Sequence, residues 1–166
     1  MKIRKVKTLI EIEEIRKRFR RRGIMTVFTN GCFDLLHRGH IHLLREAKKL
    51  GDVLIVAVND DASVRRLKGA SRPVFPLKQR LEILESIEFI DFLLSFGEDT
   101  PQIVVRRLLP DVLVKGGDWR PGEVVGKKEV EKSGGKVVVI PTLTGYSSSG
   151  LIERISAAAV KRRKNE

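Results

Sequence analysis

The chain contains a single cysteine, Cys32, among its 166 residues, and a lone thiol excludes an intrachain disulfide. No apolar run approaches the ~20 residues that a membrane-spanning helix needs, and no signal-peptide pattern opens the sequence. We therefore expect a soluble, cytoplasmic protein with no membrane partner. The length predicts one domain over residues 1–166, with an N-terminal helical extension at 1–23, a core at 24–157 and a basic tail at 158–166.

Aromatic residues are scarce as well, at 5% of the chain, which leaves few platforms on which single-stranded nucleic acid could stack. The formal charge of +12 still raises a basic nucleic-acid-binding module as a rival function, because basic surfaces bind polyphosphates by releasing counterions. Much of this charge lies in residues 5–22 and 161–164, where solvated ends explain it, so we expect no nucleic-acid partner. Asn and Gln number only five together, which favours a heat-adapted source with many surface ion pairs.

Apolar strands alternate with helical stretches along the chain. Strands are predicted at 25–29, 52–58, 89–94, 112–114 and 137–140, with helical segments between them. This alternation predicts a Rossmann-like, doubly wound α/β sheet of five parallel strands with helices on both faces. Because such sheets bind ligands at the carboxyl ends of their strands, the residues that follow each strand are the candidates for function.

The segment after the first strand, residues 29–40, carries two histidines three positions apart. Once the backbone turns helical, His37 and His40 share one face of the first turn, beside free backbone N–H groups, and form a pocket for anionic oxygens. Gly39 removes a side chain where a phosphate would approach. The alternative to a phosphate pocket is that both histidines are structural, as helix caps or core residues. Zinc would need more ligands than the chain offers, so we predict no protein-built metal site, and a Cys32–His37 nucleophile lacks an orienting partner.

The later strand exits are also suited to phosphates. The second strand leads into residues 59–61 and a basic loop at 65–73 that could close over a polyphosphate. The fourth leads into residues 115–119, whose glycines would expose backbone to a ligand, and the fifth leads to hydroxyl-bearing residues at 144–149 before a helix. Each segment alone is commonly a turn, a cap or a solvated loop. Together on one sheet edge, they predict a nucleotide site.

Two of these motifs, His37–His40 and Gly145–Ser149, resemble those of the nucleotidyltransferases with an H-x-G-H sequence. Residues 28–37, 59–73, 99–101 and 110–118 are most similar to the heptose 1-phosphate adenylyltransferases of bacterial ADP-heptose synthesis, a likeness that covers roughly residues 25–155. The resemblance implies transfer of AMP from ATP to D-glycero-β-D-manno-heptose 1-phosphate, with magnesium as the divalent cation. It also implies a homodimer that works with a separate heptose kinase, because the kinase half of bifunctional relatives has no counterpart here.

The residues expected in the site fall into three groups. Those expected to act in catalysis are His37, His40 and Lys68. Those expected to hold the nucleotide are Thr29, Asn30, Gly31, Cys32, Phe33, Gly39, Arg72, Lys115, Gly116, Gly117, Asp118, Tyr146, Ser147, Ser148 and Ser149. Those expected to bind the substrates are Asp34, Asp60, Asp61 and Trp119, the carboxylates at sugar hydroxyls or the cation and Trp119 beside the base and ribose.

Two alternatives stay open within the enzymes. Relatives that use CTP carry an arginine three residues before the glycine of the late motif, and this chain has Thr142 there, which disfavours CTP. A cytidylyl- or adenylyltransferase acting on another small phosphate, such as glycerol 3-phosphate, remains the alternative. A nicotinamide site is disfavoured because the first strand exit lacks G-x-G-x-x-G. Arg80 is expected to pair with Glu82 or Glu85 on its own helix, or to reach the nucleotide.

Overall fold

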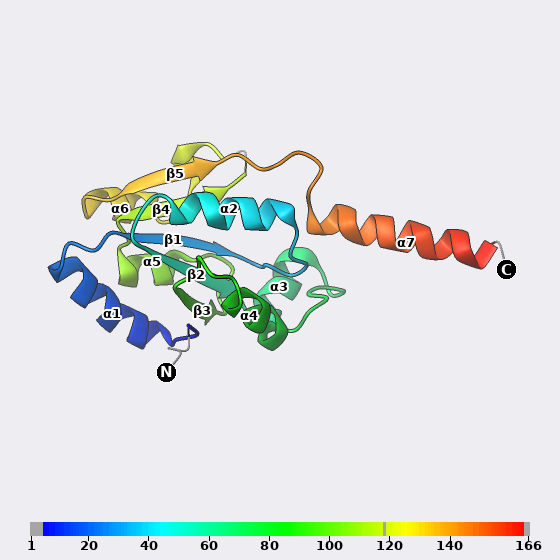
Figure 1. Cartoon of the computed structure of the whole chain (residues 1–166), viewed down its shortest axis with the longest axis horizontal. Coiled ribbons are helices and arrows are strands. Elements are labelled where there is room, and N and C mark those ends of the chain that lie inside the picture. Colours follow the sequence, from blue (N-terminus) through cyan, green and yellow to red (C-terminus); the bar gives the residue numbers. More distant parts are fainter. Residues whose placement is uncertain (1–4, 118, 165–166) are drawn as a thin grey trace.

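The computed structural model describes residues 5–117 and 119–164, and within them five parallel strands form one sheet in the order β3-β2-β1-β4-β5 (Figure 1). The strands are β1 (Thr26–Gly31), β2 (Val53–Asn59), β3 (Phe92–Phe96), β4 (Val112–Gly116) and β5 (Lys136–Ile140). The order reverses between β1 and β4, which is where doubly wound sheets open a crevice for ligands. The predicted fold class is confirmed.

Helices cover both faces of this sheet. They are α1 (Leu9–Arg21), α2 (Arg38–Lys48), α3 (Asp61–Lys68), α4 (Leu77–Glu85), α5 (Gln102–Leu108), α6 (Lys127–Lys132) and α7 (Ser148–Lys164), with a 3-10 turn η1 (Pro121–Glu123). Helices α2 and α4 pack on one face, and α1, α5 and α6 pack on the other. None of the helices in the described ranges combines the length and apolarity needed to cross a bilayer.

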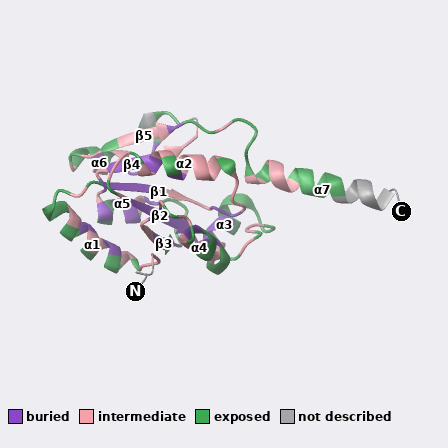
Figure 2. Ribbon diagram, viewed as in Figure 1, coloured by how far each residue is buried: buried purple, intermediate pink, exposed green. Residues whose placement is uncertain are grey.

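The core is divided by the sheet into two apolar layers, and neighbouring strand residues alternate between them. Val27 packs with Leu44 of α2 in one layer, while Phe28 packs with Val105 of α5 in the other. The inner strand β2, between β3 and β1, is buried on both faces (Figure 2), which explains its nearly continuous apolar sequence. This two-sided burial holds the strand exits rigidly at one edge of the sheet.

The segment before β1 belongs to the same core. Ile12 of α1 is fully buried against the α5 side of the sheet. Ahead of the helix, the Lys7 N–H donates to the Leu93 carbonyl at 2.8 Å, and the Leu93 N–H donates to the Lys5 carbonyl at 2.9 Å. Residues 5–7 therefore cover part of the otherwise open edge of β3, a common way to protect an edge strand from pairing with another chain.

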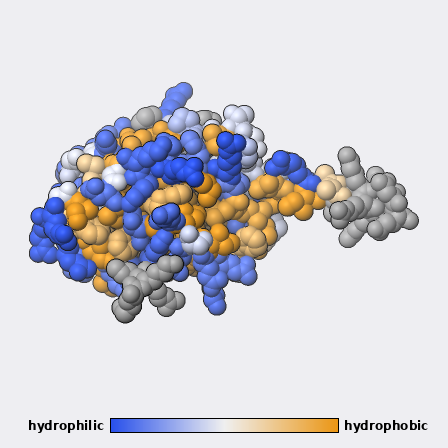
Figure 3. All heavy atoms as spheres, viewed as in Figure 1, coloured by the Kyte–Doolittle hydropathy of each residue, from blue (hydrophilic) through white to orange (hydrophobic). Residues whose placement is uncertain are grey.

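Helix α7 differs from the other helices because most of its length projects away from the body (Figure 1). Ile155 on this helix is 64% exposed, and hydrophobic side chains are visible along the part of α7 next to the body (Figure 3). Only the start of α7 therefore lies close to the sheet edge where the strands end.

Two segments differ from the prediction. The third strand was expected at 89–94 but runs over Phe92–Phe96, because residues 88–89 form a turn. Residues 65–68 were expected to begin a basic loop, but they form the second half of α3. The Asp60 carboxylate accepts a hydrogen bond from the Ser63 N–H at 2.7 Å and so caps this helix, which ends at Gly69 with φ +98°. The loop prediction was wrong because Asp60 acts as an N-cap, and only residues 69–73 remain available as a basic loop.

Candidate active site

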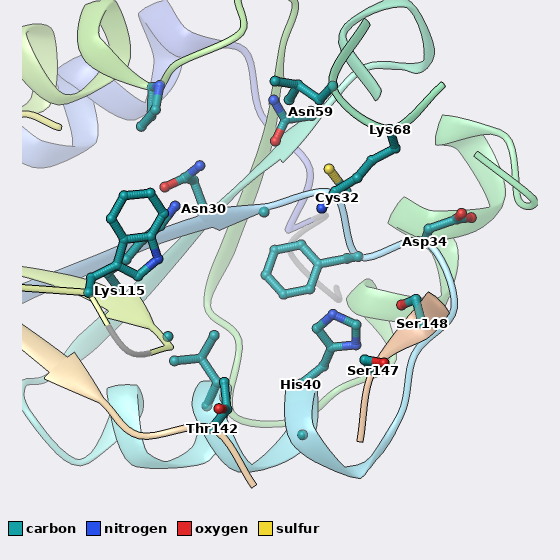
Figure 4. A pocket seen from close by; sticks show the side chains of 18 of the residues that line it. Asn30, Cys32, Asp34, His40, Asn59, Lys68, Lys115, Thr142, Ser147 and Ser148 are labelled. Carbon is teal, nitrogen blue, oxygen red and sulfur yellow. The ribbon is translucent and has the colours of Figure 1, made fainter. Parts of the chain in front are cut away.

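A cavity of about 600 Å³ lies at the carboxyl ends of the strands, around the point where the strand order reverses (Figure 4). Its size suits a small-molecule ligand. Of the residues expected in the site, the cavity is lined by Asn30, Gly31, Cys32, Phe33, Asp34, His37, Gly39, His40, Lys68, Arg72, Lys115, Gly116, Trp119, Tyr146, Ser147, Ser148 and Ser149. The fold therefore brings four distant stretches of sequence to one cavity.

The two histidines of the H-x-G-H segment stack on each other at this cavity. His37 is the N-cap of α2, and its Nδ1 accepts a hydrogen bond from the Gly39 N–H at 3.1 Å. His40 lies in the first turn, with its ring centroid 3.9 Å from that of His37 and the two planes inclined by 29°. The centroid of the Phe33 ring lies 5.4 Å from that of His40. The pair is thus fixed in place before any ligand arrives.

Both imidazoles are neutral at pH 7. Burial lowers the pKa of His40 to about 4, with a further contribution from the adjacent His37, and burial also lowers the pKa of His37. A neutral imidazole carries one N–H donor, which can bind a phosphate oxygen. An anion in the cavity would favour the protonated form, so the pair can respond to a bound polyphosphate by taking up a proton.

The low pKa of His40 predicts a pH-dependent loss of stability. Between pH 6.5, the ordinary histidine value, and about 4, the unfolded chain binds a proton that the folded chain excludes. The titration of His40 therefore leaves the free energy of unfolding unchanged above pH 6.5 and lowers it progressively as the pH falls from 6.5 toward 4. We expect the H40N variant to lose less unfolding free energy than the wild type between pH 7 and pH 4, as measured by urea denaturation. A parallel decline of both proteins would contradict the assignment.

Two glycines of the site serve packing. A Cβ at Gly39 would lie 2.9 Å from Cε1 of His37, so the space expected to admit a phosphate is filled by the His37 ring. A Cβ at Gly116 would lie 2.9 Å from a methyl group of Leu43, so this glycine lets α2 approach β4. Gly117, at φ +123°, does not line the cavity.

Two lysines bring positive charge to the cavity, and among the ion pairs of the described residues neither has a carboxylate partner. Lys115 lies near the end of β4, and burial together with the neighbouring Lys68 lowers its pKa, while its Nζ lies 5.4 Å from the Trp119 ring centroid. Lys68, the last residue of α3, points toward Cys32 (Figure 4). Burial raises the pKa of the Cys32 thiol, which disfavours a cysteine nucleophile.

Asp34 anchors the loop over the cavity. Its buried carboxylate accepts hydrogen bonds from the Val74 N–H at 2.8 Å and the Phe75 N–H at 2.9 Å, and it pairs with Nε of Arg72 at 2.6 Å. Burial opposes ionisation, but these hydrogen bonds outweigh it and hold the pKa of Asp34 below its usual value. The carboxylate was expected near the sugar or the cation, whereas the structure commits its oxygens to the loop.

Asp60 and Asp61 were expected near the ligand, yet neither lines the cavity. Asp60 caps α3, and the Asp61 carboxylate accepts from the Leu77 N–H at 2.9 Å and from Nη2 of Arg80 at 2.7 Å. Both carboxylates are therefore occupied by local structure. The expected pairing of Arg80 with Glu82 or Glu85 is wrong, because its partner comes from a different helix.

Arg80 is a fully buried junction beneath the cavity. Its Nη1 donates to the carbonyls of Cys32 and, at 2.8 Å, of Asn59, and its Nε donates to the Phe75 carbonyl at 3.0 Å. With the Asp61 carboxylate, this guanidinium joins the exits of β1 and β2 to the segment before α4. A buried cation with every group paired rigidifies the segments it connects.

Three other residues differ from the site predicted from the sequence, and a fourth lies outside the described residues. Thr29 is fully buried and does not line the cavity, and Asp118 lies outside the described residues. Asn59 lines the cavity but was not named as a site residue, and its amide donates to Ser63 Oγ at 3.0 Å. The position of Asn59, a polar residue at the end of a buried strand, was the sequence feature that could have identified it. Thr142, in the late motif, also lines the cavity (Figure 4).

The start of α7 closes the site on the side of α2. The Ser147 hydroxyl accepts from the Gly150 N–H at 3.0 Å and caps the first turn, and the Ser148 hydroxyl donates to the Leu35 carbonyl at 3.2 Å. Arg38 donates to the Tyr146 hydroxyl at 3.3 Å. Two helix N-termini, those of α2 and α7, therefore meet at one cavity, an arrangement suited to anionic groups.

The chain is similar in sequence to proteins of known name. The bifunctional protein HldE of Salmonella arizonae is 49% identical over 156 residues, which cover 94% of this chain and 33% of that protein. The HldE of Escherichia coli O1:K1 is 54% identical over 136 residues, which cover 82% of this chain and 28% of that protein. The chain thus spans about a third of the length of the curated relatives it matches.

Solved structures show the same fold. The crystal structure of the lipopolysaccharide core biosynthesis protein from Thermoplasma volcanium matches with a TM-score of 0.60 and 32% identity, covering 75% of this chain and all of that one. A pantoate-beta-alanine ligase from Francisella tularensis matches with a TM-score of 0.59 and 20% identity, covering 87% of this chain and 68% of that one. This similarity is one of fold alone. A cytidylyltransferase-like family model matches residues 28–162. Since this match covers most of the chain, including the whole cavity-forming edge of the sheet, the chain belongs to the cytidylyltransferase-like family.

Proposed function

We propose that this chain transfers AMP from ATP to D-glycero-β-D-manno-heptose 1-phosphate, giving ADP-heptose and pyrophosphate. The observation that carries the proposal is the stacked pair His37 and His40, which faces a cavity that Lys68 and Lys115 also line. The choice of sugar rests on the resemblance of the sequence motifs, and it is supported by the identity of about half to proteins named HldE and by the likeness to a lipopolysaccharide core biosynthesis protein.

This reaction requires the sugar phosphate and ATP to be aligned, and it does not require a general base to remove a proton. A sugar phosphate is already ionised at neutral pH, so one of its oxygens can attack the α-phosphorus of ATP without a general base. As that bond forms, the bond from the α-phosphorus to the bridging oxygen breaks, and the electron pair leaves with pyrophosphate. Negative charge then grows on the α-phosphate and the leaving group, where the N–H groups of His37 and His40 would stabilise it. Backbone amides at Ser147–Ser149 would hold the outer phosphates.

We propose magnesium as the divalent cation, held mainly by the substrate. Magnesium commonly binds nucleotide phosphates together with one or two carboxylates. In the part of the chain that the structure describes, no three side chains of His, Cys, Asp or Glu gather into a cage. Of the carboxylates at the cavity, Asp34 is fully engaged and Asp99 pairs with Arg66 at 2.7 Å. These residues fit a cation that enters with the phosphates and neutralises their charge.

The proposal is tested by measuring pyrophosphate release with each nucleotide and each acceptor. We expect ATP with heptose 1-phosphate to give the highest kcat/KM, and ATP with glycerol 3-phosphate to react at least about a hundredfold more slowly, as for substrates that leave polar groups of a site unpaired. Faster turnover of CTP with glycerol 3-phosphate would contradict it. The rival nucleic-acid function predicts salt-dependent binding of DNA or RNA that survives loss of both histidines.

We further propose that the enzyme acts as a homodimer and receives its sugar 1-phosphate from a heptose kinase. Equilibrium sedimentation of the full chain tests the first point, and a single species of 18.8 kDa would contradict it.

A further inference from the structure

Two polar atoms beside the site are buried without a hydrogen-bond partner among the described residues. They are the hydroxyl of Thr29 and Nδ1 of His40. An unsatisfied buried polar group costs about 1–3 kcal/mol, and proteins contain few of them. Two such atoms in neighbouring elements suggest one shared explanation.

The strand places the Thr29 hydroxyl on the α2 side of the sheet. Val27 packs in the layer formed with α2, and residues two apart on a strand point to the same face. Thr29 therefore points into this layer as well, at a position two residues closer to the carboxyl end of β1, where the cavity opens.

The helix places His40 on the matching face of α2. Leu44 and Ala47 are fully buried in the same layer, and His40 lies four and seven positions before them, so all three share the stripe that faces the sheet. Moving from Ala47 to His40 advances about 10 Å along α2. Because α2 packs on β1 and starts at the cavity, this direction leads toward the end of β1 that holds Thr29.

We propose that Thr29 is a positioning residue for His40. Its hydroxyl donates a hydrogen bond to one buried water, and that water donates a hydrogen bond to Nδ1 of His40. Nδ1 then acts as the acceptor, so the proton of the neutral ring resides on Nε2. The Nε2–H group is left to face the cavity, where it can donate to a phosphate oxygen. The catalytic part of this inference rests on the proposed function, whereas the choice of tautomer does not.

The test compares T29V, which removes the hydroxyl and keeps the shape, with T29S, which keeps the hydroxyl. In the full-length wild type without substrate, the ¹⁵N shifts of the His40 ring should report the Nε2–H tautomer, and T29V should show a mixture of tautomers. T29S should restore the wild-type pattern. With substrates, T29V should lower kcat about tenfold with KM for ATP nearly unchanged, as expected when a group that orients a histidine is lost.

T26V is the matched control. Thr26 is also fully buried on β1, but its hydroxyl donates to the Asp111 carboxylate at 2.9 Å, far from the cavity. We expect T26V to lower stability and to leave the His40 ring shifts unchanged. Wild-type ring shifts in T29V would overturn the proposal. An altered tautomer in T29V with no turnover of heptose 1-phosphate by the wild type would instead uphold the positioning role and refute the proposed substrate.

Discussion

Alanine in place of His37 or His40 is expected to lower kcat about a hundredfold, because each variant loses one donor that stabilises transition-state charge, a loss of about 3 kcal/mol. Stability should change much less. H37A removes the N-cap of α2, which costs about 1 kcal/mol, and H40A removes a ring whose Nδ1 has no direct hydrogen-bond partner among the described residues. Pyrophosphate release at saturating ATP and urea denaturation measure the two effects separately.

His42 provides the matched control for this experiment. It lies on α2, two positions beyond His40, and does not line the cavity. H42A should therefore keep wild-type turnover. Because the two cavity rings stack, the double variant H37A/H40A should lose less than the product of the single losses. Wild-type kcat in both single variants would contradict the proposed role of the pair.

The second large effect is expected from R80M, which should lower the free energy of unfolding by about 3 kcal/mol. Methionine fills the space of the Arg80 stem but removes the guanidinium donors from the Asp61 carboxylate and from three carbonyls. Breaking a buried pair by removing one partner costs about 3–5 kcal/mol. The lower end applies because Asp61 is 30% exposed and can be partly rehydrated.

R107M is the control for this prediction. Arg107 also pairs with a carboxylate, that of Glu13, but its side chain is 42% exposed. Exposed pairs contribute about 0–1 kcal/mol, so R107M should change stability little. R80K should not restore stability, since an ammonium cannot reach all the acceptors that the planar guanidinium spans. Equal losses in R80M and R107M would show that Arg80 is not the junction of the strand exits.

The local sequence was enough to predict the parts of the site that depend on strand exits. Buried strands and the helix start beside His37 follow from residue type and spacing within a few positions. The missed helix α3 shows the limit of that reading, because basic residues at 65–68 suggested a loop while the Asp60 cap, which overrides them, was overlooked.

Local residue patterns fix the alternation of strands and helices, and with it the sheet edge at which His37 and His40 lie, because apolar periodicity and capping act over a few neighbouring residues. The partners of the buried charges, by contrast, follow from the assembled fold. Arg80 meets Asp61, Asp34 holds residues 72–75, and Thr29 lies beneath α2 in the layer of His40, because strand order and helix packing bring these distant segments together. A pattern of local sequence does not specify such pairings, since each depends on the whole sheet being assembled.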